Sequence, residues 1–174
     1  YMFNGGGYGG HTGGDGLSYG SPIISVARSQ PVELYEQRYP VRIRKFALRE
    51  ESAGAGKHRG GFGAVIETEF VRGEGTASII SDRGKFAPRG IEGGEDGEKC
   101  HIEFIRGGEK YVSPHLTKDS NIRMEPGDVV RLFTPGGGGY GDPLERDPAL
   151  VLDDVRNGFI STTSGVDEYG VVIV

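Results

Sequence analysis

Apolar and polar side chains alternate along several short stretches of this chain, and glycine, proline or aspartate flanks most of them. The alternation is clearest in residues 41–48 (VRIRKFAL), and it recurs across residues 62–71. A period of two predicts half-buried strands. Shorter strands are predicted at 23–26, 77–80, 101–105, 110–112, 129–134 and 171–174. About seven strands with frequent turn signals favour a mostly antiparallel β architecture.

Proline and capping residues predict where helices begin and end. A short helix is expected after Pro31, which suits a first turn, and it must end before Pro40, because proline pushes the preceding residue out of the helical region. A second helix is predicted over 148–156, with Asp147 as its N-cap and Gly158 as its stop. Between Ile160 and Gly170 a third helix capped by Ser161 is a weaker prediction.

Glycine accounts for 32 of the 174 residues and concentrates in four stretches: 1–20, 52–61, 84–99 and 134–142. Glycine destabilises helices and strands, so we interpret these stretches as long loops. The expected fold is therefore mainly β (α+β): an antiparallel β-rich domain with long Gly-rich loops and one or two C-terminal helices. We divide it into an arm or loop that packs on a partner (1–20), a β-rich domain (21–142) and a helical segment with a final strand (143–174).

Charge and cysteine content exclude several classes of protein. The net charge is −5, and the basic residues are scattered apart from a small group at Arg42, Arg44 and Lys45, which argues against nucleic-acid binding. No apolar run approaches the roughly 20 residues that span a bilayer. Cys100 is the only cysteine, so a disulfide-stapled secreted module is excluded and a cytoplasmic location is expected.

The segment 135–143 (PGGGGYGDP) is the most distinctive motif. Successive glycine amides can cradle an anion, but the P-loop pattern needs a lysine followed by serine or threonine, and neither is present. A tight structural loop is the favoured interpretation.

Three residues are weak candidates for catalysis: Asp15, Glu36 and Arg59. Asp15 offers a carboxylate in a Gly-rich stretch, although a turn-forming role is favoured. Glu36 pairs with Glu33 at helical spacing, which suits proton or metal chemistry but more often forms ion pairs with nearby arginines such as Arg59. The four histidines show no zinc-ligand spacing, and Cys100 is a lone thiol, so no metal or cofactor site is expected within this chain.

Several phrases taken together resemble the hydantoinase B/oxoprolinase family. They are GGDG from Gly13, the segment 30–63 (QPVELYEQRYPVRIRKFALREESAGAGKHRGGFG), the segment 135–161 (PGGGGYGDPLERDPALVLDDVRNGFIS) and YGVV from Tyr169. The resemblance runs from about Gly13 to the end of the chain. Two stretches depart from the family pattern: Glu51-Ser52-Ala53-Gly54 stands where Asp-Ser-Gly-Gly is usual, and the stretch after Ile160 is less helical.

This resemblance implies the C-terminal part of a longer B-type subunit that works with a hydantoinase A-type partner and with the remainder of the B-type subunit. It implies ATP and a divalent metal ion in the complex, both bound outside this chain. The family hydrolyses cyclic amides or carboxylates ketones with bicarbonate, without biotin. We slightly favour a ketone carboxylase, with a cyclic amidohydrolase or a non-catalytic structural or binding module as alternatives. The chain is not expected to be active alone, and neither nucleic acid nor a membrane is an expected partner.

Overall fold

The computed structural model describes residues 2–21 and 30–172. Its helices are α1 (Val32–Arg38), the 3-10 turn η1 (Pro143–Glu145), α2 (Pro148–Arg156) and α3 (Thr162–Asp167). Its strands are β1 (Val41–Leu48), β2 (Ala64–Phe70), β3 (Gly75–Ile80), β4 (His101–Arg106), β5 (Glu109–Tyr111), β6 (Lys118–Met124) and β7 (Val129–Phe133). The strand predicted at 23–26 lies outside the described residues, as do residues 173 and 174, and residues 171–172 form no strand.

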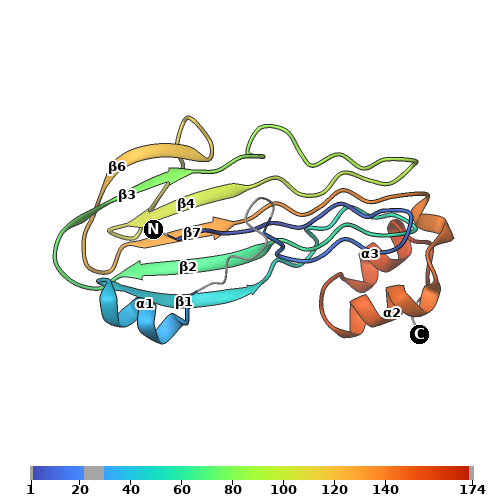
Figure 1. The fold of residues 1–174 in the computed structure, drawn as a ribbon, viewed down its shortest axis with the longest axis horizontal. Coiled ribbons are helices and arrows are strands. Elements are labelled where there is room, and N and C mark those ends of the chain that lie inside the picture. The colour runs from blue at the N-terminus through green and yellow to red at the C-terminus, as the bar shows by residue number, and fades with distance from the viewer. Residues whose placement is uncertain (1, 22–29, 173–174) are drawn as a thin grey trace.

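Five strands form one antiparallel sheet in the order β1-β2-β7-β4-β5 (Figure 1). The register places Phe46 opposite Ile66, Ile66 opposite Leu132, and Leu132 opposite Ile102, so these apolar side chains share one face. The alternation seen in the sequence is therefore the pleat of this sheet, and the prediction of a mainly antiparallel fold with C-terminal helices is confirmed.

A second, two-stranded sheet of β3 and β6 packs on that apolar face. Ile122 and Met124 from β6 meet Cys100, Ile102 and Phe104 from β4 in one hydrophobic cluster. The sequence analysis missed β6, because its residues (KDSNIRM) are mostly polar and only these two are buried.

In their described residues, the four Gly-rich stretches form neither helices nor β-strands, but they are not loose surface loops. They lie side by side as long extended segments at the end of the molecule opposite α1 (Figure 1). Their backbone hydrogen bonds repeat every three residues. The amides of Gly136 and Gly139 donate to Glu98 and Glu95, and those of Gly137 and Tyr140 donate to Gly61 and His58. A three-residue period is that of the polyproline-II helix, which has no internal hydrogen bonds and so leaves its amides and carbonyls free to pair with neighbouring segments.

Segment 136–140 is the centre of this bundle, and its glycines leave no room for a side chain. A Cβ on Gly136 would lie 1.5 Å from the carbonyl oxygen of Ser52, and one on Gly137 would lie 1.8 Å from that of Tyr8. A Cβ on Gly138 would meet Arg89, and one on Gly139 would meet Ala55. Successive positions thus face different neighbouring segments, so the interior of the bundle consists of backbone.

The arm before residue 21 belongs to this bundle. The amides of Gly7 and Gly10 donate to the carbonyls of Pro135 and Gly138, again three residues apart. One side of the arm therefore lies on this chain itself, and a further contact with a partner stays a prediction.

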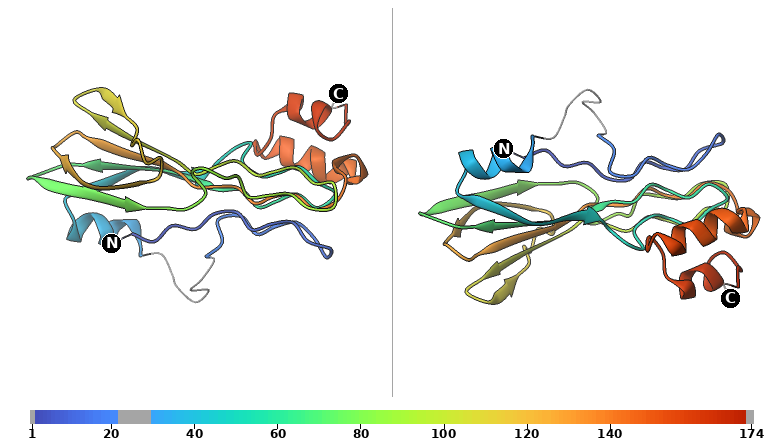
Figure 2. Two further views of the ribbon diagram at one scale, coloured as in Figure 1. Left: turned by 90° about the horizontal axis from the view of Figure 1, so that it is seen from above. Right: turned by 90° about the horizontal axis from the view of Figure 1, so that it is seen from below.

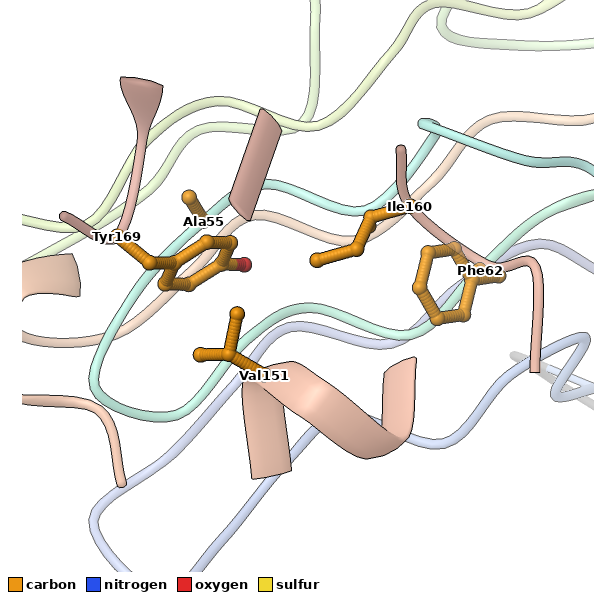
Figure 3. Packing of buried hydrophobic residues seen from close by; sticks show 5 residues of the cluster. All are labelled: Ala55, Phe62, Val151, Ile160 and Tyr169. Atoms are coloured by element: carbon orange, nitrogen blue, oxygen red, sulfur yellow. The ribbon is translucent and has the colours of Figure 1, made fainter. Parts of the chain in front are cut away.

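Helices α2 and α3 pack on the bundle from the side opposite the arm and α1 (Figure 2). Val151, Ile160 and Tyr169 bury their side chains against Ala55 and Phe62 of the Gly-rich segments (Figure 3). The predicted caps are confirmed: Asp147 accepts a hydrogen bond from the amide of Ala149, and Gly158 has a positive φ of 71°. Ser161 caps α3 as predicted.

Helices long and apolar enough to cross a bilayer are absent from the part of the chain that the structure describes.

Candidate functional site

Two of the three candidate residues, Asp15 and Arg59, meet in one cluster with Arg146 and Asp154. Arg146 donates to both carboxylate oxygens of Asp15, at 2.7 and 2.8 Å, and to Asp154 at 3.0 Å. Arg59 donates to both oxygens of Asp154, at 2.9 and 3.1 Å, while its backbone amide donates to Asp15 at 3.0 Å. The cluster joins the arm, the segment 58–61, the turn before α2 and α2 itself.

The cluster is shielded from water on most sides. The side chain of Arg146 is 1% exposed and that of Asp154 is 7% exposed. The Arg59 guanidinium lies over the ring of Phe62, with 4.5 Å between its carbon and the ring centroid, and the Arg146 guanidinium lies near the Tyr169 ring. Two cations and two anions compensate one another, which a buried charge requires.

The pKa of Asp15 shows how tightly this carboxylate is held. Burial alone would raise its pKa, but the hydrogen bond and charge of Arg146, helped by Arg59, hold the pKa below its ordinary value of 3.8. A general base near neutral pH needs a raised pKa and a free lone pair directed at a substrate. The pKa of Asp15 is lowered rather than raised, and its carboxylate is held by Arg146 and Arg59, so the cluster is suited to fastening the helical tail and the arm to the bundle.

Glu36 lies away from this cluster. Its carboxylate accepts a hydrogen bond from the backbone amide of Ile43 at 2.7 Å, which ties α1 to the outer edge of β1. The structure therefore assigns Glu36 a structural partner, although that partner is a backbone amide rather than an arginine.

Most amides of the glycine motif at 135–143 are paired within the bundle rather than presented to an anion. The amides of Gly136, Gly137, Gly139 and Tyr140 all donate to carbonyls within the bundle. The structural interpretation of this motif agrees with that pairing.

Cys100 and the histidines do not converge on a reactive centre. Cys100 is 3% exposed, burial raises the pKa of its thiol, and its sulfur lies 3.3 Å from the Ser81 hydroxyl. In residues 2–21 and 30–172, no group of three or more His, Cys, Asp or Glu side chains is placed to hold a metal ion.

The two places where the sequence departs from the family pattern touch each other. The Glu51 carboxylate accepts hydrogen bonds from the Ser161 amide at 2.6 Å and from the Ser164 hydroxyl at 2.9 Å. Ser161 also caps α3 through its own hydroxyl. Glu51 therefore fixes the start of the helix that the Ser/Thr-rich stretch forms.

Sequence reasoning missed Arg146 and Asp154. A signal for Asp154 was present, because it lies three residues after the buried Val151 and so shares the buried face of α2. Arg146 had no comparable signal, since it lies between η1 and α2.

Comparison with known proteins finds a matching family model and homologues for this chain. The family model described as Hydantoinase B/oxoprolinase matches residues 1–143. A homologue from Pseudomonas sp. (strain NS671), named as the B-type component of a D-/L-hydantoinase, is 38% identical over 97% of this chain. The beta chain of the caprolactamase of Pseudomonas jessenii is 37% identical over 83% of this chain.

Solved structures show the same fold. The ATP-dependent caprolactamase from Pseudomonas jessenii superposes with a TM-score of 0.80 at 33% identity, over 97% of this chain and 30% of that one. A nucleotide-free acetone carboxylase superposes with a TM-score of 0.84 at 20% identity, over 97% of this chain and 26% of that one. The chain spans only part of these curated relatives, 28% of the hydantoinase component and 25% of the caprolactamase beta chain.

Proposed function

Because the chain belongs to the hydantoinase B/oxoprolinase family, we propose that it forms part of the B-type subunit of an ATP-dependent enzyme that acts on a small amide or ketone. Its role there is to supply the rigid glycine bundle and the sheet on which the reaction centre is assembled. ATP and a divalent metal ion are held by other parts of the complex, the A-type partner and the remainder of the B-type subunit. The cytoplasmic location is part of this proposal.

The observation that carries the structural role is the pairing of the Asp15–Arg59–Arg146–Asp154 cluster. Each of these side chains is engaged within the chain, and together they join the arm, the bundle and α2. Buried ion networks of this kind fix the relative position of the elements they connect. The alternative of a free-standing binding module predicts a stable monomer without partners.

Sequence identity supports hydrolysis of a cyclic amide as the first reaction to test. The chain is 33% identical to the caprolactamase and 20% identical to the acetone carboxylase, and the lower value supports a shared fold only. The ketone carboxylation favoured from sequence is the second candidate, because that carboxylase shares the fold over nearly all of this chain.

The test is to purify the native particle through a tag on this chain and to supply ATP with each substrate class. Caprolactam, 5-oxoproline and hydantoin form one set, and acetone or acetophenone with bicarbonate forms the other. We expect ADP or AMP formation coupled to ring opening of a cyclic amide. Coupling to ketone carboxylation would reverse the preference, and a monomeric particle without ATP turnover on either set would contradict the proposal.

A further inference from the structure

Among the described residues, no helix or strand forms a packed layer on one face of the five-stranded sheet. The Tyr19 ring lies 5.2 Å from that of Phe46, which places the arm on the apolar face. On the opposite face, named here the open face, α2 and α3 lie over the bundle end, and no other described helix or strand covers β1, β2 and β7 (Figure 2).

A row of charged side chains crosses the open face from edge to edge. The register sets Lys45 opposite Glu67, Glu67 opposite Arg131, and Arg131 opposite Glu103. Lys110 of β5 reaches the same Glu103 carboxylate. The row therefore alternates in sign and has a lysine at each end.

Carboxylates on this face are already compensated from within. Glu67 pairs with Arg131 at 2.8 Å, and Glu69 pairs with Arg44 at 2.7 Å. Glu103, whose side chain is 8% exposed, accepts from His101, Lys110 and Arg131. Burial acts to raise the pKa of Glu103, but Lys110 and His101 hold it below its ordinary value. These three acids can therefore lose water without leaving an unpaired anion.

The cations, in contrast, are in excess. Arg42, Arg44, Lys45, Arg131 and Lys110 face three carboxylates, an excess of two positive charges on a chain whose net charge is −5. Among the residues that the structure describes, Lys45 has no ion-pair partner. A surface that meets this face must bring negative charge if the complex is to be electrostatically complementary.

Apolar side chains accompany the charged row. Val65, Phe133 and Lys45 line a groove of about 580 Å³, together with His101 and Glu103. Aromatic and arginine side chains next to a desolvated apolar floor are the usual centre of a protein–protein interface.

We propose that the open face is the docking surface for another protein chain of the assembled enzyme, one that presents aspartate or glutamate carboxylates beside apolar side chains. This inference rests on the proposed function, because it is the hetero-oligomer that supplies such a chain. The partner's carboxylates pair with Lys45 and Lys110, and its apolar side chains cover Val65 and Phe133.

Lysine acetylation followed by mass spectrometry tests the proposal on the native particle and on the isolated chain. Lys110 and Lys118 form a matched pair, since their side chains are 56% and 57% exposed and each forms an ion pair, but Lys118 belongs to β6 on the other side of the sheet. In the particle we expect Lys45 and Lys110 to react at least about fivefold more slowly than in the isolated chain, as in the water-excluded centre of an interface, and Lys118 to keep its rate. Equal rates at all three lysines would overturn the inference.

A charge reversal gives a second readout. Lys45→Glu lies on an exposed part of β1 and should leave the fold intact, while the dissociation constant of the complex rises about tenfold, which corresponds to ~1.4 kcal/mol. Lys118→Glu should leave that constant unchanged. Protection of Lys45 and Lys110 that appears in the isolated chain together with a dimeric mass would identify a second copy as the occupant and reject the proposal.

The two proposals fail separately. Turnover of a cyclic amide or ketone with Lys45 and Lys110 still reactive would remove the docking surface and keep the enzyme. Protected lysines in a particle without ATP-dependent turnover would keep the surface and remove the proposed activity.

Discussion

Arg146 donates two parallel hydrogen bonds to the carboxylate of Asp15, although 131 residues separate the two in sequence. The pair closes the chain on itself, since Asp15 belongs to the arm and Arg146 precedes α2. The same guanidinium also binds Asp154, so one buried cation links the arm to the helical tail.

Replacing Arg146 with alanine should therefore be strongly destabilising. The change removes one of the two cations that compensate the buried Asp154 carboxylate. Breaking a buried pair in this way costs about 3–5 kcal/mol of unfolding free energy. Urea denaturation of the two proteins measures the difference. As a control, Lys57→Ala removes the exposed pair with Glu145 and should change stability by less than about 1 kcal/mol. Similar decreases in the free energy of unfolding for both variants would show that the buried cluster contributes no more to stability than an exposed ion pair.

A methyl group at the centre of the bundle should be costly in the same assay. Gly137→Ala would place its Cβ 1.8 Å from the Tyr8 carbonyl oxygen, so backbone segments must move apart, at about 3 kcal/mol or more. Gly9→Ala is the matched control, because Gly9 belongs to the same bundle but its Cβ would contact the Gly138 carbonyl at 3.7 Å, an ordinary distance. A Gly137→Ala protein as stable as Gly9→Ala would contradict the packing described.

Stability should depend on pH through Asp15. Burial acts to raise its pKa, but Arg146 and Arg59 hold the folded pKa below the ordinary 3.8. A lowered folded pKa gives stabilisation that is fully present above 3.8 and is lost as the pH falls through the folded value. The stability difference between wild type and Asp15→Asn should thus be constant near neutral pH and shrink as the pH falls below 3.8. A difference that stays constant through that window would show that Asp15 is not held as the anion.

Glu36 should prove structural rather than catalytic. Glu36→Ala removes the acceptor of the Ile43 amide, and loss of ~1.4 kcal/mol at that bond would raise its hydrogen-exchange rate about tenfold. In the native particle, Glu36→Gln keeps an acceptor and should leave kcat unchanged. A large fall in kcat with an unchanged fold would return Glu36 to the catalytic candidates.

The sheet could be predicted from sequence because its burial pattern is local. Ile66 of β2 is buried, as its place in the apolar and polar alternation of the sequence predicts. The caps Asp147 and Ser161 lie directly before α2 and α3. Strand β6 escaped prediction because its partner β3 is distant in sequence and most of its side chains face water.

Neither the bundle nor the charged cluster could be read in this way, because both depend on contacts between distant segments. No single glycine segment differs from a loop until its neighbours are in place, although glycines at three-residue intervals, as at Gly7, Gly10, Gly13 and Gly16, are a usable signal. Asp15 and Arg59 were named as candidates, but their partners, Arg146 and Asp154, are distant from them in sequence.

The interior of the bundle is made of backbone, so the glycines of PGGGGYGDP serve to let neighbouring carbonyls approach closely. They need not take part in a reaction. Any protein that keeps this architecture needs glycine at these central positions, whether it opens lactam rings or forms carbon–carbon bonds. The glycines of this segment thus reflect how the bundle is packed. Differences in chemistry among such proteins are to be sought in the side chains that project from the glycine bundle.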